Sequence, residues 1–412
     1  MNKVGRIPLA ETANGESKTR LDIVKEWLAE NYEVRINLLD RSKISLTATA
    51  KCPMTYEFPV TEEDILLHAY SDELPIPRGL LKNLLASPNQ MRSFNPVHDY
   101  IGSLRGKYKG PSQIDLLCNS LHLVDETARK RRVVVMRKWL VATVACALGI
   151  RQNDVALGLV GERAGIGKTT FFEQIVPESL KEYYQVAQKD ERVFQMHTAF
   201  AQRFLLNFDE FAAITQASEQ LFKQLMSAQE VVVRRPGSRY VETVPRVASC
   251  CFTSNKTQQM GGFIRTSDEG MLRRLAVIEV DSIDDYRERL DVDQLWAEAV
   301  MLLDGGFDPV WSQQEYQNFV TDNRQYVVES KSVRLIRRYF RHPGNDEKPV
   351  FLSASDIICQ MREKKLIRAS DEGISEKSIG QALTLLGFAR HGKWDKDAAN
   401  SRYGYEVIPL FS

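Results

Sequence analysis

One stretch near the middle of the chain constrains the fold more than any other. The residues VALGLV, from position 155, are apolar without alternation, and GERAGIGKTTFFEQIV follows them directly. A continuous apolar run is typical of a central strand that is buried on both faces of a parallel sheet, and the apolar periodicity after the glycine-rich turn predicts a helix. We therefore expect an α/β domain in which a glycine-rich loop joins a buried strand to a helix.

The core of this turn, GIGKTT, is suited to phosphate. Its glycines allow backbone N–H groups to converge on phosphate oxygens, and a helix N-terminus adds partial positive charge. Lys168 would reach the β- and γ-phosphates, and the Thr169 hydroxyl would bind Mg²⁺. Five residues rather than four separate Gly161 from Gly167, so the first turn departs from the strict GxxxxGK[ST] pattern. The residues expected to hold ATP are Gly165, Ile166, Gly167, Lys168, Thr169 and Thr170.

Two further apolar strands end in polar residues. FLLNFDEF places Asp209 and Glu210 after an apolar run, where paired acids are costly to bury unless they bind a cation or water. We expect Asp209 to hold the Mg²⁺ and Glu210 to polarise the attacking water. Without the upstream loop, the pair would read as a strand-end turn. The strand in VASCCFTSNK ends in the polar residues Thr253, Ser254 and Asn255. Asn255 is interpreted as a sensor that hydrogen-bonds the γ-phosphate or the water; an ordinary turn asparagine is the alternative.

Arg273 and Arg274 immediately precede a fourth predicted strand, in EGMLRRLAVIEV. A planar, permanently charged guanidinium can stabilise the charge that spreads during phosphoryl transfer, often from a neighbouring subunit. Structural ion pairs are the alternative. If one of the two acts as such a finger, the active site lies between subunits and the protein forms a ring or partial ring.

In their order along the chain, GIGKTT, FDEF, a basic hairpin, TSN and LRRLAVIEV resemble the superfamily 3 helicases. They resemble more closely the virulence-associated protein E family of phage and mobile-element replication proteins. NPVHDYIGSL and RKWLVATVACALG also look like the segments before the P-loop in that family, and the resemblance covers residues 60–310. It implies an ATPase domain of the AAA+ type that assembles as a hexameric ring around DNA. No primase motif is evident in the N-terminal module, so a primase would be a separate protein.

The balance of 55 Lys and Arg against 54 Asp and Glu means that any nucleic-acid site must be a local patch. QEVVVRRPGSRYVETVPR predicts a β-hairpin with a basic tip. We expect Arg234, Arg235 and Arg239 to contact DNA phosphates there, a role that the resemblance places in the ring channel; a solvated turn is the alternative. The cluster at 129–138 reads as a solvated helix face or a partner contact, and that at 331–341 as a second basic patch or a linker helix.

The last sixty residues predict a separate small module. SASDIICQMREK and SEKSIGQALTLLG read as two helices, and FARHGKW and RYGYEVI as two strands, an order typical of a winged helix. Lys377 and Ser378 would then lie on the exposed face of the second helix and Lys393 and Arg402 on the wing, where DNA could contact them. The charge of this segment is nearly balanced, so protein docking remains open.

A chain of 412 residues is long enough for several domains. We predict a small α+β module at 1–60, a helical region at 61–150, a P-loop AAA+ ATPase of the superfamily 3 type at 151–310, a basic linker helix at 311–350 and a winged helix at 351–412. No apolar segment has membrane-spanning length, and the six cysteines show no zinc-ligand spacing. We therefore expect a cytoplasmic protein with buried free thiols and no membrane contact.

The leading hypothesis is an ATP-driven, Mg²⁺-dependent DNA helicase or translocase that acts on a single strand or fork during replication of a phage, plasmid or integrated element. A separate primase or initiator is the expected protein partner. Two alternatives stay open: an ATP-switched winged-helix regulator that does not unwind DNA, and an interaction protein with a vestigial P-loop. The arginine-tipped hairpin favours the motor, because a pure switch needs no arginines facing a channel.

Overall fold

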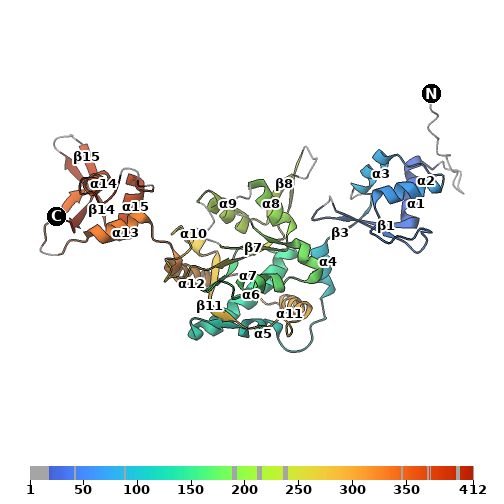
Figure 1. Ribbon diagram of the computed structural model, residues 1–412, viewed down its shortest axis with the longest axis horizontal. Helices are drawn as coiled ribbons and strands as arrows, with labels where there is room; N and C mark the ends of the chain where they lie inside the picture. The colour runs from blue at the N-terminus through green and yellow to red at the C-terminus, as the bar shows by residue number, and fades with distance from the viewer. Residues whose placement is uncertain are drawn as a thin grey trace, which may run out of the picture. The chain divides into compact units, whose positions relative to one another are not determined.

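The computed structural model describes residues 18–40, 43–87, 90–187, 193–210, 216–234, 240–344, 347–368, 371, 373–395 and 400–411. Figure 1 shows its helices and strands, with labels on part of them. Two units divide the chain: the first comprises Met1–Asn255 and Arg273–Phe319, and the second Lys256–Leu272 and Val320–Ser412. Among the described residues, no helix combines the length and the apolar character needed to cross a membrane.

The N-terminal part of the first unit packs helices on a small sheet. Its elements are α1 (Arg20–Asn31), β1 (Tyr32–Asn37), β2 (Ile44–Ala48), α2 (Glu62–Ser71), α3 (Arg78–Leu85) and β3 (Arg92–Phe94). Strand β1 pairs antiparallel with β2 and parallel with β3. Capping boxes at Thr19 and Thr61 satisfy the first N–H groups of α1 and α2. One apolar core cluster, with members from Val24 to Leu85, holds this part together.

The helical run that follows leads to the central sheet. Its elements are α4 (Pro96–Ser103), α5 (Gln113–Asn119), β4 (Leu121–Leu123) and α6 (Arg129–Ala147). The first turns of α6 carry the basic residues of the 129–138 cluster, whereas every residue from Trp139 to Ala147 is buried. The Trp139 indole N–H donates to the carbonyl oxygen of Cys250 at 3.2 Å, so α6 is fixed directly to a strand of the sheet.

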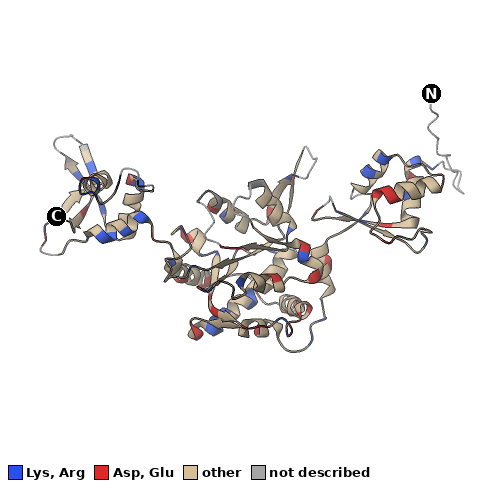
Figure 2. Cartoon of the chain, in the orientation of Figure 1, with Lys and Arg blue, Asp and Glu red and all other residues tan. Residues whose placement is uncertain are grey.

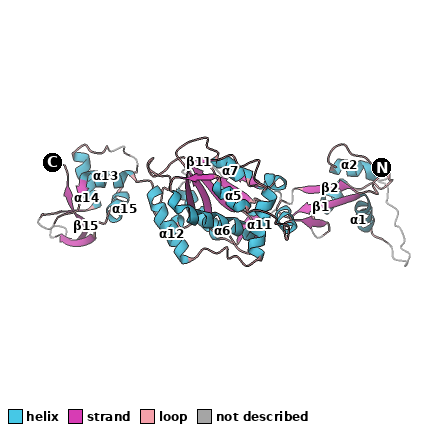
Figure 3. Ribbon diagram, turned by 90° about the horizontal axis from the view of Figure 1, so that it is seen from below, coloured by secondary structure: helices cyan, strands magenta, loops and turns pink. Residues whose placement is uncertain are grey.

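A six-stranded sheet forms the centre of the first unit, in the order β4-β11-β5-β10-β7-β6. The remaining strands are β5 (Ala156–Val160), β6 (Tyr184–Val186), β7 (Leu205–Phe208), β10 (Ser249–Ser254) and β11 (Leu275–Ile283). All neighbouring pairs are parallel except β4 with β11. Every residue of β5, β7 and β10 is buried, because helices cover the sheet; α5, α6, α7 and α11 are labelled beside it in Figure 3. The predicted α/β fold with a central parallel sheet is confirmed.

The other elements of the first unit connect these strands. They are α7 (Lys168–Gln174), α8 (Val193–Gln202), α9 (Gln216–Ser227), β8 (Glu230–Arg234), β9 (Val241–Pro245) and α11 (Val292–Asp304), while α12 (Gln313–Asn323) carries the chain into the second unit. Strand β10 enters the sheet between β5 and β7. Its register pairs Ser254 with Val160 and Phe252 with Phe208, so the carboxyl ends of three strands lie side by side.

The second unit contains the predicted C-terminal helices and strands. Its elements are α10 (Glu269–Leu272), α13 (Lys331–Tyr339), β12 (Phe340–Arg341), β13 (Val350–Leu352), α14 (Ala354–Glu363), α15 (Glu376–Leu385), β14 (Arg390–Asp395) and β15 (Asn400–Pro409). Strand β15 pairs antiparallel with β12, β13 and β14. The expected capping box joins Ser353 to Asp356, and Gly387, with φ 85°, follows α15. Ile336, Ile357 and Leu383 belong to the apolar core under this sheet. The domain boundaries proposed from the sequence remain predictions.

Candidate nucleotide site and nucleic-acid surfaces

The glycine-rich loop joins β5 to α7, as the sequence predicts. Gly165 has φ 77° and Gly167 has φ 91°, and at neither position would an added Cβ meet another atom within 4 Å. The left-handed backbone therefore requires glycine here, while the space in front of the loop stays open. Helix α7 begins at Lys168 with Gly167 as its N-cap. Ile166 packs against the core, and Thr170 is exposed.

The departure from the strict phosphate-loop pattern has a packing cause. A Cβ on Gly161 would lie 2.3 Å from the carbonyl oxygen of Val280 in β11. The Gly161 N–H donates to the carbonyl oxygen of Ser254 at 3.1 Å, which continues the pairing of β5 with β10. Gly161 therefore serves the close approach of strands, and the phosphate-loop turn proper lies after it.

Lys168 is held within the loop. Its side chain is buried, and Nζ donates to the carbonyl oxygens of Gly161 at 3.0 Å and Arg163 at 2.8 Å. Burial lowers the pKa of the Lys168 ammonium, and attraction by the Asp209 carboxylate opposes that shift. Both of these acceptors are neutral carbonyl oxygens, and the acidic Asp209 lies close enough to affect the ammonium.

Three segments of the chain meet at one carboxylate oxygen of Asp209. The Thr169 hydroxyl, from α7, donates to Oδ1 at 3.0 Å, and the Thr253 hydroxyl, from β10, donates to the same atom. Hydroxyl and carboxylate oxygens are the ligands that Mg²⁺ prefers, so this donor set fits the predicted metal. The sequence had singled out Thr253 only as a polar strand-end residue; its contact with Asp209 follows from the insertion of β10 between β5 and β7.

Glu210 and Asn255 lie at the same edge of the sheet. Glu210 follows Asp209 with φ 48°, a left-handed conformation that is unusual for glutamate and is typical of functional turns. Its side chain is exposed, whereas Asn255, directly after β10, is half-buried. Their positions are compatible with the predicted roles toward water and the γ-phosphate.

The structure separates the two adjacent arginines before β11. Arg274 is 7% exposed, and its guanidinium donates to the Ser227 hydroxyl at 2.5 Å at the end of α9. Arg273 is exposed, and its guanidinium lies 5.7 Å from the centre of the Tyr316 ring. Only Arg273 therefore presents its guanidinium toward solvent.

The predicted basic hairpin is present as β8 and β9. Val231 and Val233 of β8 are buried, while Arg234, which pairs with Val241, is exposed at the end of the strand. Arg235 and Arg239 lie outside the described residues. Tyr240, just before β9, is 80% exposed, a feature that sequence reasoning missed because an aromatic next to a strand is usually part of the core.

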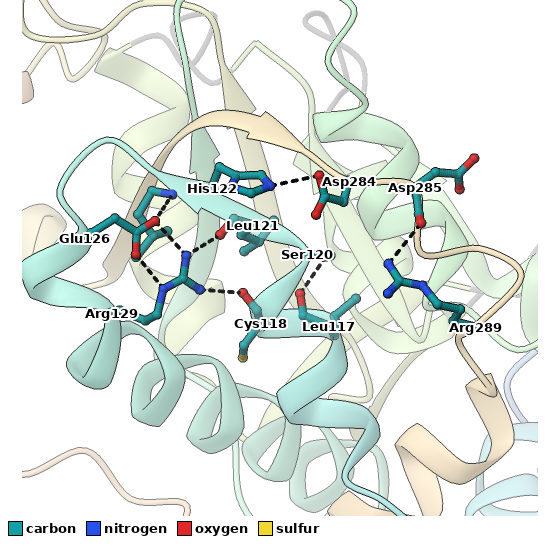
Figure 4. A network of polar contacts seen from close by, with 11 residues as sticks. Leu117, Cys118, Ser120, Leu121, His122, Glu126, Arg129, Asp284, Asp285 and Arg289 are labelled. Carbon is teal, nitrogen blue, oxygen red and sulfur yellow. Dashed lines mark hydrogen bonds and ion pairs between the residues drawn. The ribbon is translucent and has the colours of Figure 1, made fainter.

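The basic cluster at 129–138 is drawn into contacts within the chain. Figure 4 shows the Arg129 guanidinium between Glu126 and the carbonyl oxygens of Cys118 and Leu121. The hydrogen bond from Arg129 lowers the pKa of the Glu126 carboxyl to about 2. Further along α6, Arg137 pairs with Asp115 at 2.6 Å and Lys138 with Glu315 at 2.7 Å. These contacts favour the structural interpretation of the cluster over a phosphate surface.

The second basic cluster, at 331–341, lies along α13, where Figure 2 shows basic residues on the ribbon. Three of its cations form ion pairs: Lys331 with Asp371, Arg337 with Glu329 and Arg341 with Glu347. These acids lie outside the cluster in sequence. The surface charge left for a nucleic acid is therefore smaller than the sequence suggests.

The C-terminal candidates divide between surface and interior contacts. Lys377 is exposed on α15, and the Lys393 ammonium, on β14, lies 5.6 Å from the centre of the Phe351 ring. Ser378 was expected on the exposed face of the same helix; instead its hydroxyl accepts from the Ser332 hydroxyl at 2.9 Å, so it faces α13. The Arg402 guanidinium is bound to the Asp356 carboxylate.

Comparison with known proteins gives a family and several structural likenesses. A family model described as the virulence-associated protein E-like domain matches residues 103–329. Among solved structures, the chain is similar to the apo structure of the NrS-1 C-terminal region, with 13% identity and a TM-score of 0.46 over 95% of this chain and 100% of that one. Another form of the same region gives 11% identity and a TM-score of 0.45, over 96% of this chain and 100% of that one. Among curated proteins, none matched the sequence.

Proposed function

Because the chain belongs to the virulence-associated protein E-like domain family, we propose that it is an ATP-driven DNA helicase or translocase that serves replication of a phage, plasmid or integrated mobile element. In this proposal the first unit contains a Mg²⁺-dependent P-loop ATPase of the AAA+ type. The observation that carries the proposal is the meeting of Thr169 and Thr253 at Oδ1 of Asp209, directly beside the buried Lys168.

Each residue at this edge of the sheet has a distinct task in the proposal. Phosphate oxygens are charged acceptors and bind an ammonium more strongly than carbonyl oxygens do, so Lys168 exchanges its loop partners for the β- and γ-phosphates of ATP. Thr169 and Asp209 hold Mg²⁺, which neutralises the charge that develops on the transferring phosphoryl group. Glu210 orients the attacking water, and Asn255 hydrogen-bonds the γ-phosphate or that water.

Arg273 is the proposed finger supplied to a neighbouring subunit. A finger acting in trans needs an exposed guanidinium, and Arg274 instead contacts Ser227 within its own subunit. The active sites then lie between the subunits of a ring, for which a hexamer is proposed. Mixing Arg273→Ala protein with Lys168→Ala protein tests this arrangement, because each intact site needs one residue from each partner. Partial recovery of ATP hydrolysis is expected, and its absence would argue against a finger in trans.

DNA is the proposed partner of both units. In the first unit, the hairpin of β8 and β9 carries Arg234 toward the strand that the motor moves. In the second unit, the helix–strand–strand–helix–helix–strand–strand order from α13 to β15 supports a winged helix, with Lys377 and Lys393 as its contacts. Contacts between cations and phosphates make binding weaken as salt rises, which a titration at several salt concentrations measures.

Forked-DNA unwinding by Lys168→Ala beside wild type is the primary test. Lys168→Ala should lose both ATP hydrolysis and unwinding. Lys181→Ala is the matched control, since Lys181 is an exposed lysine of the same unit that pairs with Glu178. Equal unwinding by wild type and Lys168→Ala would refute the motor. Hydrolysis by wild type without unwinding of any fork would assign the chain to an ATP-switched regulator instead.

A further inference from the structure

The tip of the C-terminal hairpin carries two large aromatic side chains that solvent reaches. Trp394 of β14 is 63% exposed and Tyr403 of β15 is 59% exposed. Strand register pairs Tyr403 with Gly392 and Trp394 with Ser401, so the two rings are diagonal neighbours on one face of the hairpin. The Tyr403 ring lies over Gly392, where an added Cβ would be 3.4 Å from the ring.

A cation completes this face. The Arg390 guanidinium lies 5.1 Å from the centre of the Tyr403 ring, and Arg390 is exposed. A guanidinium held over a ring keeps its N–H groups in the plane, where they can reach phosphate oxygens. We call Arg390, Trp394 and Tyr403 the wing platform.

The face of the hairpin that carries the wing platform also packs on α15. Tyr405, two residues after Tyr403 and so on the same face, is buried and donates to the carbonyl oxygen of Gly380 at 3.4 Å. Lys377, one turn before Gly380, is exposed. The wing platform therefore shares its face of the hairpin with the contact that joins β15 to α15, the helix that carries Lys377.

Charge decides which occupant fits this surface. The described positions of β14 and β15 on the platform face are Arg390, Gly392, Trp394, Ser401, Tyr403, Tyr405, Val407 and Pro409, none of which is acidic. On the opposite face Glu406 lies 3.5 Å from His391, and Asp356 is bound by Arg402. Two exposed rings, one of them with the Arg390 guanidinium over it, provide stacking planes for bases and a contact for the phosphates between them.

From this geometry we infer that the wing platform binds single-stranded nucleic acid by stacking unpaired bases on Trp394 and Tyr403. A base inside an intact duplex has both its faces covered by neighbouring base pairs, so the platform takes a single strand or a frayed end. The inference rests on the proposed function only in taking nucleic acid as the ligand. It does not require ATP hydrolysis.

Tryptophan fluorescence reports the platform directly. Trp139, Trp296 and Trp311 are buried, and the indole N–H of the half-buried Trp27 donates to Asp72 at 2.8 Å, which leaves Trp394 as the most accessible indole. Titrating the full chain with oligothymidylate should quench emission, equally in wild type and in Lys168→Ala. Trp394→Phe should abolish the quenching while retaining binding, measured by fluorescence anisotropy of a labelled strand, because phenylalanine still stacks.

The affinity variants test stacking itself. Trp394→Ala and Tyr403→Ala should each weaken binding of the labelled strand by about five- to one-hundred-fold. Tyr70→Ala, which removes an exposed tyrosine of α2, is the matched control and should leave the affinity unchanged. Quenching in Lys168→Ala separates this inference from the proposed motor. If Lys168→Ala shows quenching while wild type does not hydrolyse ATP, the platform is supported and the motor proposal is refuted.

Four results would overturn the inference. The first is unchanged emission at saturating oligothymidylate, and the second is quenching by blunt duplex DNA as strong as that by the single strand. The third is an emission shift with protein concentration alone, which would assign the face to a second copy of the chain. The fourth is unaltered affinity in folded Trp394→Ala and Tyr403→Ala proteins.

Discussion

Arg246 provides a quantitative test of how the basic hairpin is anchored. The residue directly follows β9, and its side chain is 2% exposed. The guanidinium donates to four backbone carbonyl oxygens, those of Ala248 (3.0 Å), Leu225 (3.1 Å), Met226 (2.5 Å) and Asn153 (2.7 Å). Two of these acceptors end α9 and one precedes β5. A single side chain thus ties the returning strand of the hairpin to the helix and to the segment that enters the phosphate-loop strand.

Arg246→Met removes these bonds while keeping an apolar chain of similar length. Hydrogen bonds from a charged donor contribute about 1.5 kcal/mol each at the low end, so four give about 6 kcal/mol. Burial of the methionine returns about 1.5–3 kcal/mol. Replacing a buried ion pair can be neutral, but here the acceptors are main-chain carbonyls that stay buried without a donor, so the loss prevails. We therefore expect Arg246→Met to lower the free energy of unfolding by about 3–5 kcal/mol.

Urea unfolding followed by tryptophan emission measures this loss. Trp139 and Trp296 are buried in the same unit as Arg246, and a Trp394→Phe background removes the exposed indole. The expected change corresponds to about 6–20 °C in melting temperature. The stability of Arg246→Lys, which keeps the charge but has fewer N–H donors, should lie between that of wild type and that of Arg246→Met. A loss below about 1 kcal/mol for Arg246→Met would refute the reasoning, because four buried bonds of this kind cannot contribute so little.

Three further predictions concern single contacts. Thr253→Val removes a hydroxyl that donates to Asp209, so ATP hydrolysis at limiting Mg²⁺ should fall at least about tenfold, with Thr253→Ser retaining most activity in a Mg²⁺ titration. Gly161→Ala places a methyl group 2.3 Å from a carbonyl oxygen of β11 and should destabilise the chain by about 1–3 kcal/mol in the same urea assay. Arg129 lowers the pKa of Glu126 to about 2, so this pair stabilises the fold above the ordinary glutamate pKa near 4.5 and ceases to do so as pH falls toward 2. The urea midpoint of Glu126→Gln should therefore lie below that of wild type at pH 7, and the gap should narrow between pH 5 and pH 3.

Local patterns in the sequence predict the strand, glycine-rich loop and helix of the candidate nucleotide site well. An unbroken apolar run, a glycine-rich turn and a helix follow one another within β5 and α7, so their order and boundaries are encoded over a few residues. Asp209 and Asn255 follow apolar strands in the same way. Strand order is a different matter, because no local pattern states that β10 lies between β5 and β7; the contact of Thr253 with Asp209 depends on that insertion.

Charge clusters are harder to interpret from sequence, because the partners of an ion pair can be far apart along the chain. Lys138 pairs with Glu315 at a separation of 177 residues, and Lys331 pairs with Asp371 at a separation of 40. A run of basic residues without nearby acids therefore looks available to phosphate although folding brings acids to it. Arg246 shows the same limit, since its partners are backbone carbonyls that leave no trace in the sequence.

Burial in the folded chain, rather than the sequence motif, distinguishes the two adjacent arginines before β11. The sequence treats Arg273 and Arg274 alike, because both precede an apolar run. Both residues lie in the turn between α10 and β11, and the structure buries one of them and leaves the other exposed. Arg274 is the buried one and contacts Ser227, while Arg273 points outward over Tyr316. A residue that acts on a neighbouring subunit must be exposed to solvent in its own subunit, as Arg273 is. The buried Arg274 instead connects the end of α9 to the start of β11 through its hydrogen bond to Ser227. Under the proposed role of Arg273 in trans, the two arginines therefore have different tasks: one offers an exposed guanidinium, and the other makes a buried contact within its own subunit.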